Sequence, residues 1–306
     1  MDRLADDGRR ITRQDHSVTM NTLTAPVYMM AIDHRWQWVE WCDAHGVDHG
    51  RIREVKRLAA DAFLLARRDS DDAMTSGALL VDLIYGVEAF ARAKAGGVTP
   101  GTPAEKAGVF PLEWTGAFER ALPGSFAKVL VRHRADTPHE MVDAQMQMLL
   151  DLQTWCRQAS KPLVLEVLIS GASDDASFER EGRPRLLAEY IRRAYARHLI
   201  PEFWKIEGMP NAGAMRILDE AILERDGPRQ LILGKGAGLD AVSTWFDAAR
   251  GAASAAGFAI GRTVYWDAAC QFLLGRLPAD DAVHQMAGNF LEVIRLWCAR
   301  ERSGRS

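Results

Sequence analysis

The chain of 306 residues is 48% hydrophobic and carries a formal net charge of −3, which is typical of a globular protein with enough apolar side chains for one large core. Because it lacks the excess of Lys and Arg that nucleic-acid binding requires, we expect no nucleic-acid partner. No apolar stretch reaches the roughly 20 residues that span a bilayer, so we also expect no membrane partner.

The four cysteines are widely spaced and form no CxxC pair, which favours a reduced, cytoplasmic protein. Residues 1–24 are polar and lack the apolar run of a secretory signal, so we expect a flexible N-terminal tail in which Met20 is an alternative start. The charged residues 301–306 are expected to form a flexible C-terminal tail. A single folded domain then covers residues 25–300.

Between the tails, short apolar runs alternate with longer amphipathic segments. We predict strands at residues 27–32, 78–83, 108–112, 126–131, 163–169, 203–206, 230–233 and 257–260. We predict helices at residues 50–67, 87–95, 115–121, 138–160, 183–198, 212–225 and 239–255, with a final helical set within 266–300.

Runs that are almost wholly apolar, such as 163–169, are typical of parallel strands covered on both faces. Eight β–α units of this length predict an α/β fold, the (β/α)8 TIM barrel, in a single domain. A doubly wound open sheet is the alternative, but the glycine fingerprint expected after its first strand is missing.

Lys205 stands in the middle of the short apolar run 203–206. A buried lysine is costly unless it is paired or deprotonated. A deprotonated amine is the nucleophile that Schiff-base formation requires. The structural alternative is a lysine that forms an ion pair with Glu207 or extends to solvent at the strand end. This stretch alone does not decide between the catalytic and the structural interpretation.

Charged residues occur at other predicted strand ends, where a barrel gathers its chemistry. Lys128 lies in the fourth apolar run and Glu166 in the fifth. Lysines on strands four and six can point into the same interior, where each would lower the pKa of the other and yield a neutral amine. We therefore predict that one of the two lysines is the nucleophile and the other an electrostatic partner for the substrate oxygens, with Glu166 as the proton-transfer group.

Glycine-rich segments follow the seventh and eighth predicted strands. Barrels bind phosphate at this position through backbone N–H groups and a helix N-terminus. Glycine allows close backbone approach and a nearby cation supplies charge, although an ordinary tight turn is the alternative. We predict a phosphate site formed by Gly234, Lys235, Gly236, Gly261 and Arg262.

A metal-dependent aldolase would need several ligands that converge on one point. Two histidines, His34 and His133, stand near strand ends, where Glu166 and Asp82 could join them. Their spacing matches no metal motif. We therefore expect no metal ion and no other cofactor.

Six motifs in chain order carry a resemblance to a known family. They are Ala31-Ile32-Asp33-His34-Arg35-Trp36, Val81-Asp82 with Tyr85-Gly86, Glu105-Lys106, Lys128-Val129-Leu130-Val131-Arg132, Trp204-Lys205-Ile206-Glu207-Gly208 and Gly261-Arg262-Thr263. They resemble the 2-deoxy-5-keto-D-gluconate 6-phosphate aldolase domain (DUF2090 type) of myo-inositol catabolism, which is often fused behind a sugar kinase. The chain is also similar to class I tagatose-bisphosphate aldolases. The resemblance covers about residues 25–298.

The resemblance implies a lyase of the class I aldolase type that cleaves the keto-sugar phosphate to dihydroxyacetone phosphate and malonate semialdehyde. It implies that Lys205 forms the Schiff base, while Lys128, Glu166 and Asp33 assist proton transfer and orient hydroxyl groups. The further residues assigned to substrate binding are Arg35, Asp82, Glu207 and Arg132. Aldolase barrels commonly associate, so a homo-oligomer that binds a small sugar phosphate is expected.

Two departures from the family pattern leave a second hypothesis open. The relatives carry an acidic residue and a glutamine after the Asp of strand two, where this chain has Leu83-Ile84, and the 306 residues do not include the kinase half. A catalytically idle barrel that binds a sugar phosphate and regulates a partner protein is therefore the alternative. A metal-dependent lyase is a third hypothesis, and it predicts loss of activity with a chelator.

Overall fold

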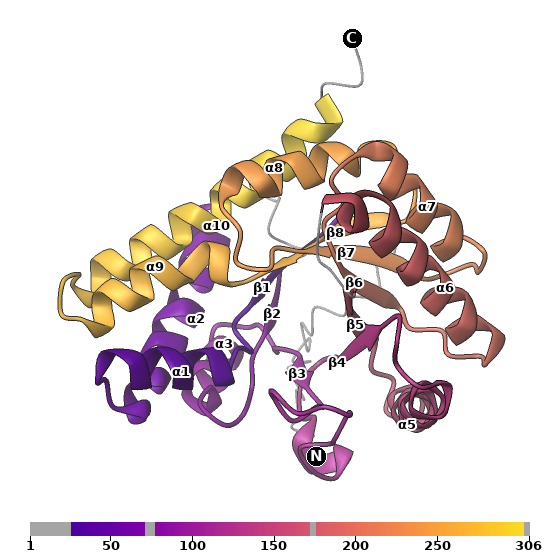
Figure 1. The fold of residues 1–306 in the computed structure, drawn as a ribbon. Coiled ribbons are helices and arrows are strands. Elements are labelled where there is room, and N and C mark those ends of the chain that lie inside the picture. The colour runs from indigo at the N-terminus through magenta and orange to yellow at the C-terminus, as the bar shows by residue number, and fades with distance from the viewer. Residues whose placement is uncertain (1–25, 71–76, 172–175, 303–306) are drawn as a thin grey trace, which may run out of the picture.

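Eight parallel strands form the centre of the protein in the computed structural model, which describes residues 26–70, 77–171 and 176–302 (Figure 1). The sheet order is β2-β1-β8-β7-β6-β5-β4-β3, and a parallel bridge from Leu80 to Gly101 joins its two ends. The predicted single-domain (β/α)8 barrel is therefore confirmed. The strands are β1 (Val27–Ala31), β2 (Gly77–Leu80), β3 (Thr102–Pro103), β4 (Ala127–Arg134), β5 (Leu163–Ser170), β6 (Phe203–Glu207), β7 (Arg229–Leu233) and β8 (Ala255–Ile260).

Alternate strand residues fill two separate cores, because successive side chains of a strand point to opposite faces. In β1, Met29 and Ala31 belong to the cluster inside the barrel, whereas Tyr28 and Met30 belong to the larger cluster between sheet and helices. Both faces of the sheet are thus buried. This explains why the strand sequences are almost continuously apolar.

The helices lie outside the sheet, and the C-terminal helix α10 packs on α2 and α9 (Figure 1). The predicted final helical set divides near Gly275, whose φ of 69° favours glycine. The helices are α1 (Trp36–His45), η1 (His49–Arg51), α2 (Ile52–Asp69), α3 (Val87–Ala95), α4 (Phe118–Ala121), α5 (His139–Gln158), η3 (Phe178–Gly182), α6 (Arg183–Ala196), α7 (Ala212–Ile222), α8 (Leu239–Ala248), α9 (Arg262–Leu273) and α10 (Ala279–Arg302).

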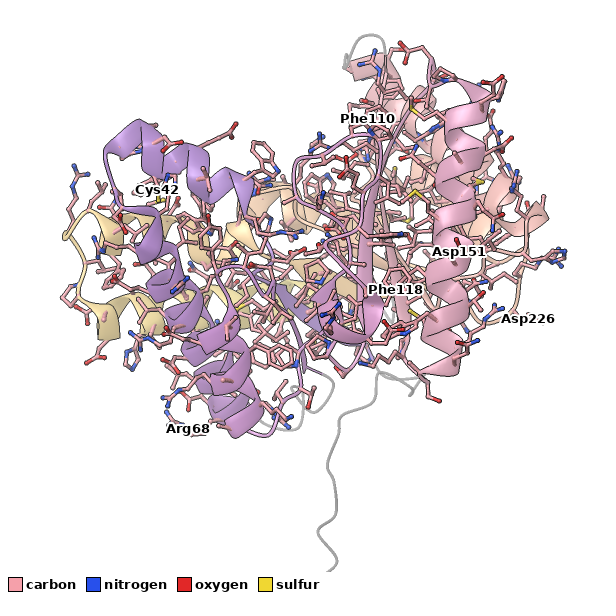
Figure 2. All side chains as sticks on the ribbon, turned by 90° about the horizontal axis from the view of Figure 1, so that it is seen from below. Cys42, Arg68, Phe110, Phe118, Asp151 and Asp226 are labelled. Atoms are coloured by element: carbon pink, nitrogen blue, oxygen red, sulfur yellow. The ribbon has the colours of Figure 1, made fainter. Side chains whose placement is uncertain are left out.

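The prediction of a third strand at residues 108–112 is wrong. The third strand is β3, only two residues long, and 108–112 lie in the loop that follows it. Phe110 of this loop is 45% exposed, so its apolar character does not reflect a buried strand. Figure 2 labels Phe110 in this loop and Phe118 in the short helix α4 beside α5, where Phe118 packs 5.7 Å from the ring of Trp155.

The predicted N-terminal tail, residues 1–24, lies outside the described residues, as does the end of the predicted tail 301–306 beyond Arg302. Within the described ranges, no helix is both long enough and apolar enough to cross a membrane.

Candidate active site

A cavity of about 210 Å³ opens at the carboxyl ends of the strands. Polar residues predicted from separate parts of the sequence meet there, because the C-terminal ends of all eight strands face the same mouth of the barrel. The predicted site residues that line the cavity are Asp33, Arg35, Lys128, Arg132, Glu166, Lys205, Gly234, Lys235, Gly236, Gly261 and Arg262. Asp82 and Glu207 are not among the lining residues.

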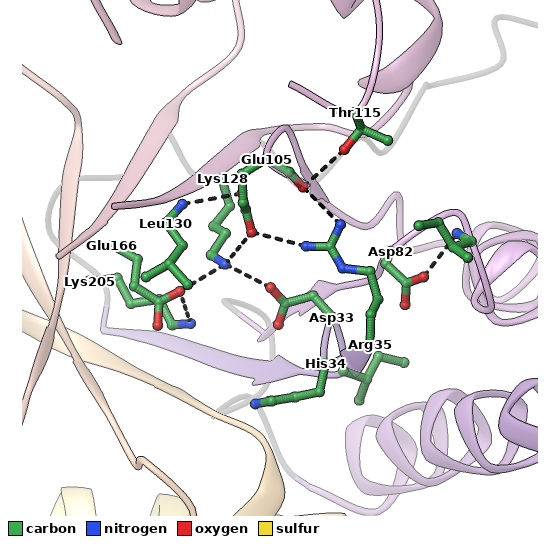
Figure 3. Close-up of polar contacts among 12 residues, drawn as sticks. Asp33, His34, Arg35, Asp82, Glu105, Thr115, Lys128, Leu130, Glu166 and Lys205 are labelled. Carbon is green, nitrogen blue, oxygen red and sulfur yellow. Dashed lines mark hydrogen bonds and ion pairs between the residues drawn. The ribbon is translucent and has the colours of Figure 1, made fainter. Parts of the chain in front are cut away.

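Lys128 on β4 lies at the centre of a buried network of charges (Figure 3). Its Nζ is 2.9 Å from Asp33 Oδ2, 2.9 Å from Glu105 Oε1 and 2.9 Å from Glu166 Oε2. The ammonium group is thus enclosed by carboxylates from the segments that follow β1 and β3 and from the middle of β5. Such an arrangement stabilises buried charges only when every partner is present.

The prediction that Lys128 and Lys205 lower each other's pKa to give neutral amines is wrong for Lys128. Burial alone would lower the pKa of Lys128, but the carboxylates of Asp33, Glu105 and Glu166 raise it well above its ordinary value. The sequence analysis counted the second lysine and missed the surrounding acids. Lys128 is therefore held in its charged form at pH 7.

Lys205 on β6 is only 5% exposed, and its Nζ lies 2.8 Å from Glu166 Oε2. The contact follows from strand register, because Glu166 of β5 is paired directly with Lys205. Burial would raise the pKa of Glu166, yet Lys128 and Lys205 together lower it. The same reasoning holds for Asp33, whose pKa is well below its ordinary value because Lys128 and Lys205 offset the effect of burial.

Glu105 is a member of this network that the sequence analysis did not assign to the site. It follows β3 and accepts a hydrogen bond from Arg35 at 3.1 Å and one from the backbone N–H of Leu130 at 3.2 Å. Arg35 also donates to the Glu105 carbonyl oxygen at 2.9 Å. Correct placement of the third strand would have put Glu105 at a strand end and identified it.

The glycine-rich segments after β7 and β8 meet at the rim of the cavity. Gly236 has a φ of 78°, and a Cβ atom there would lie 3.2 Å from the Arg262 guanidinium carbon. Glycine thus allows Arg262 to lie against the backbone of this turn, where its side chain donates to the Lys235 carbonyl oxygen at 3.0 Å. Both predicted cations of the phosphate site line the same cavity.

Glu207 bridges elements instead of lining the cavity. Its carboxylate is 2.6 Å from Lys235 Nζ and 3.6 Å from an amino nitrogen of Arg183, so it ties the loop after β7 to α6. Lys205, which stands two residues earlier, pairs with Glu166 instead. The ion pair between Lys205 and Glu207 that was the structural alternative is therefore not formed.

Asp82 is fully buried beneath the site. Its Oδ1 accepts hydrogen bonds from the backbone N–H groups of Ile84 and Tyr85, both at 2.9 Å, and its Oδ2 pairs with Lys56 of α2. Lys56 in turn donates to the carbonyl oxygens of Ile32 and His34. Asp82 thus fixes the loop after β2 and, through Lys56, the end of β1.

His34 also lines the cavity, although no role in substrate binding was predicted for it. Burial lowers the pKa of His34 to about 3, with Asp33 acting to raise it and Arg262, Lys205 and Lys56 acting to lower it further. Its imidazole is therefore neutral at pH 7. In the described part of the chain, no group of three His, Cys, Asp or Glu side chains is arranged to hold a metal ion.

Comparisons with solved structures found the same fold in class I aldolases. A fructose-bisphosphate aldolase from Plasmodium falciparum, solved in complex with TRAP and a small-molecule inhibitor, superposes with a TM-score of 0.66 at 11% identity over 92% of each chain. A Schiff-base-forming fructose-1,6-bisphosphate aldolase gives 0.51 at 17% identity over 88% of this chain and 94% of that one. The protein Cgl0159 from Corynebacterium glutamicum gives 0.57 at 16% identity over 88% and 85%.

At these identities the structural comparisons establish the fold alone. A comparison with curated protein sequences found no match. A family model described as "Uncharacterized protein conserved in bacteria (DUF2090)" matches residues 3–301. Since this match spans nearly the whole chain, the protein belongs to the DUF2090 family.

Proposed function

We propose that the protein is a class I aldolase that cleaves a phosphorylated keto-sugar acid through a Schiff base on Lys205. The observation that carries the proposal is the chain of contacts from Lys205 to Glu166 and from Glu166 to Lys128, at 2.8 Å and 2.9 Å, in one cavity. A lysine beside a proton carrier and a fixed cation has what iminium chemistry requires. The class I aldolases of the same fold add support.

In the first step the Lys205 ammonium gives one proton to Glu166, and the neutral amine attacks the ketone carbon. The new C–N bond forms as the carbonyl π electrons move to oxygen, and a proton passes from the positively charged nitrogen to this oxygen to give a neutral carbinolamine. Protonation of this hydroxyl by Glu166 lets water leave, and the nitrogen lone pair forms the iminium. Glu166 is within hydrogen-bond distance of Lys205 Nζ, as this exchange requires.

In the second step the bond between the α and β carbons of the iminium breaks, and its electron pair moves toward the iminium to form an enamine. Asp33 removes the proton of the hydroxyl group on the β carbon, which becomes the aldehyde of the departing product. Lys128, 2.9 Å from Asp33 Oδ2, holds this carboxylate ionised and able to act as the base. Protonation of the resulting enamine at carbon, followed by addition of water to the iminium, releases the ketone product and restores Lys205.

The substrate we propose is 2-deoxy-5-keto-gluconate 6-phosphate, which would yield dihydroxyacetone phosphate and malonate semialdehyde. Lys235 and Arg262 at the ends of β7 and β8 would bind the phosphate. Arg132 at the end of β4 also lines the cavity, and β4 stands four places from β8 in the sheet order. It lies on the opposite side of the barrel and would bind the carboxylate at the other end of the substrate.

Borohydride trapping tests the proposal. The protein is incubated with dihydroxyacetone phosphate, reduced, digested and analysed by mass spectrometry for the adduct. We expect the adduct on Lys205, its loss in Lys205→Met and its retention in Lys94→Met, which removes an exposed lysine of α3. An adduct on Lys128 would reverse the roles of the two lysines. No adduct on either lysine, with phosphate still bound, would favour the idle sugar-phosphate-binding barrel.

A further inference from the structure

His34 stands at the end of β1, between the charged network and the start of α9. Figure 3 shows that the side chains of His34 and Arg35 extend in different directions from this point. A Cβ atom on Gly261 would lie 2.9 Å from His34 Cε1, so the imidazole lies against the residue that precedes α9. Since His34 and Gly261 both line the cavity, the part of the ring around Cε1 is beside the proposed phosphate site.

The hydrogen bonds of Tyr265 on α9 fix which nitrogen of His34 carries the proton. The Tyr265 hydroxyl is 2.8 Å from His34 Nδ1, and its other polar neighbour is the indole of Trp38, which acts to lower the pKa of the hydroxyl as a nearby N–H donor does. An indole N–H can only donate. Within the described residues, His34 Nδ1 is therefore the one acceptor for the buried hydroxyl proton of Tyr265, which leaves the imidazole proton on Nε2.

We propose that His34 is a phosphate-binding residue, which donates the hydrogen on Nε2 to a phosphate oxygen of the ligand, and that Tyr265 is the positioning residue that holds it in this form. No protein partner for Nε2 is found in the described part of the chain. The inference rests on the proposed function, since it takes the phosphate site of that function as given. It adds a neutral donor to the cations Lys235 and Arg262.

The surroundings of His34 favour a neutral donor over a third cation. Burial is the largest effect that opposes a charge on the ring, and Arg262, Lys205 and Lys56 oppose it as well, while Asp33 favours it. A neutral imidazole can bind a phosphate oxygen without adding to the repulsion among these cations. The donor also persists if phosphate raises the pKa of His34, because the protonated ring still carries the Nε2 hydrogen.

Tyr265 is itself held rigidly. It is 2% exposed, and its ring stacks on Trp38 with centroids 6.2 Å apart and an interplanar angle of 25°. Trp38 belongs to α1, which follows His34 in the chain, and it also stacks on Trp266 at 3.9 Å. Packing between α1 and α9 therefore sets the orientation of the imidazole.

The test is NMR of the full chain labelled with ¹⁵N-histidine. His34 is assigned by its loss in His34→Asn, with His133→Asn as the control for a histidine away from the cavity. We expect the Nε2–H tautomer at pH 7 and a shift of the Nε2 signal on titration with inorganic phosphate. In Tyr265→Phe, we expect a mixture of tautomers and phosphate binding weakened only by the lost fraction of the Nε2–H form, about twofold. In His34→Asn, which removes the imidazole, we expect phosphate binding weakened about tenfold, the effect of losing one hydrogen bond to a charged group.

Three outcomes would overturn the inference: the Nδ1–H tautomer, no phosphate binding, or phosphate bound at an Arg262-dependent site without any change at Nε2. The last of these would leave the aldolase proposal intact. Conversely, a His34 response to phosphate without an adduct on Lys205 would support the inference and remove the Schiff-base chemistry. The two failures are therefore distinguishable.

Discussion

Lys128 and Lys205 share one carboxylate oxygen: Glu166 Oε2 lies 2.9 Å from the first amine and 2.8 Å from the second. The two lysines nevertheless differ. Lys128 has two further carboxylates at 2.9 Å, whereas Glu166 is the one carboxylate found within ion-pair distance of Lys205 in the described part of the chain. Lys205 therefore gives up fewer ion pairs when its nitrogen bonds to a substrate carbon.

Lys205→Met should lower the rate of C–C cleavage on the order of 10⁴-fold or more, because no other described lysine has the same position to form the iminium. The measurement is the rate of dihydroxyacetone phosphate release at saturating substrate. Circular dichroism should show an unchanged fold, and Lys94→Met should retain wild-type turnover. Wild-type turnover in Lys205→Met would end the Schiff-base proposal.

Lys128→Met should destabilise the fold more than Lys205→Met does. Removing Lys128 leaves Asp33, Glu105 and Glu166 buried without their common cation, at a cost of about 3–5 kcal/mol in the free energy of unfolding. Lys205→Met affects one carboxylate, Glu166, and Glu166 still pairs with Lys128. Urea unfolding of both variants at pH 7 measures which of the two is less stable. Equal free energies of unfolding would show that Lys128 is not the cation that stabilises the three buried carboxylates.

Arg262→Ala should raise KM for the phosphorylated substrate about tenfold or more and change kcat little, because it removes a charged hydrogen bond to phosphate rather than to the reacting carbons. Steady-state kinetics measures both constants. Trapping of unphosphorylated dihydroxyacetone on Lys205 is the control and should be unaffected. An unchanged KM would remove Arg262 from the phosphate site.

Asp82→Asn should act on stability rather than on substrate binding. The change keeps an acceptor for the loop N–H groups but leaves Lys56 buried without its carboxylate, which costs about 3–5 kcal/mol. Thermal unfolding should show a lower Tm, while KM stays as in the wild type. The matched control is Asp61→Asn, which breaks a surface pair with Arg92 and should cost less than about 1 kcal/mol. A raised KM together with an unchanged Tm would show instead that Asp82 takes part in substrate binding.

The free energy of unfolding should fall as pH is lowered from about 6.5 toward 3. The folded protein keeps His34 neutral throughout this range, whereas the unfolded chain takes up a proton near pH 6.5, so protonation favours unfolding. The stabilisation is complete above the unfolded pKa. His34→Asn should reduce the slope between pH 5 and 6.5, measured by urea unfolding, and an identical slope in the variant would contradict the low pKa of His34.

Most of the barrel could be predicted because its strands are apolar on both faces, and the mouth of a barrel then brings Lys128, Glu166 and Lys205 together. The short strand β3 could not be found this way, since the two residues Thr102 and Pro103 give no periodicity. Glu105 was therefore named in a motif but given no role in the site. The apolar run around Phe110 was predicted as the third strand instead, although Phe110 is exposed in a loop.

The roles of the strand-end acids were harder to predict than their positions. Asp82 and Asp33 occupy similar places after β2 and β1, yet one secures a loop and the other faces the cavity. That choice depends on Lys56, which reaches Asp82 from α2. Likewise, the charge state of Lys128 depends on three acids from distant parts of the chain, so the second lysine alone gave the wrong sign for the pKa shift.

The buried network is balanced in charge, with the carboxylates of Asp33, Glu105 and Glu166 matched by Lys128, Lys205 and Arg35. The charge of an incoming substrate must therefore be met at the rim, where Arg132 is exposed and the Lys235 side chain is 60% exposed. Dissolved ions screen such exposed groups far more than buried pairs. Rising ionic strength should thus weaken capture of the substrate while the chemical steps within the barrel proceed at the same rate.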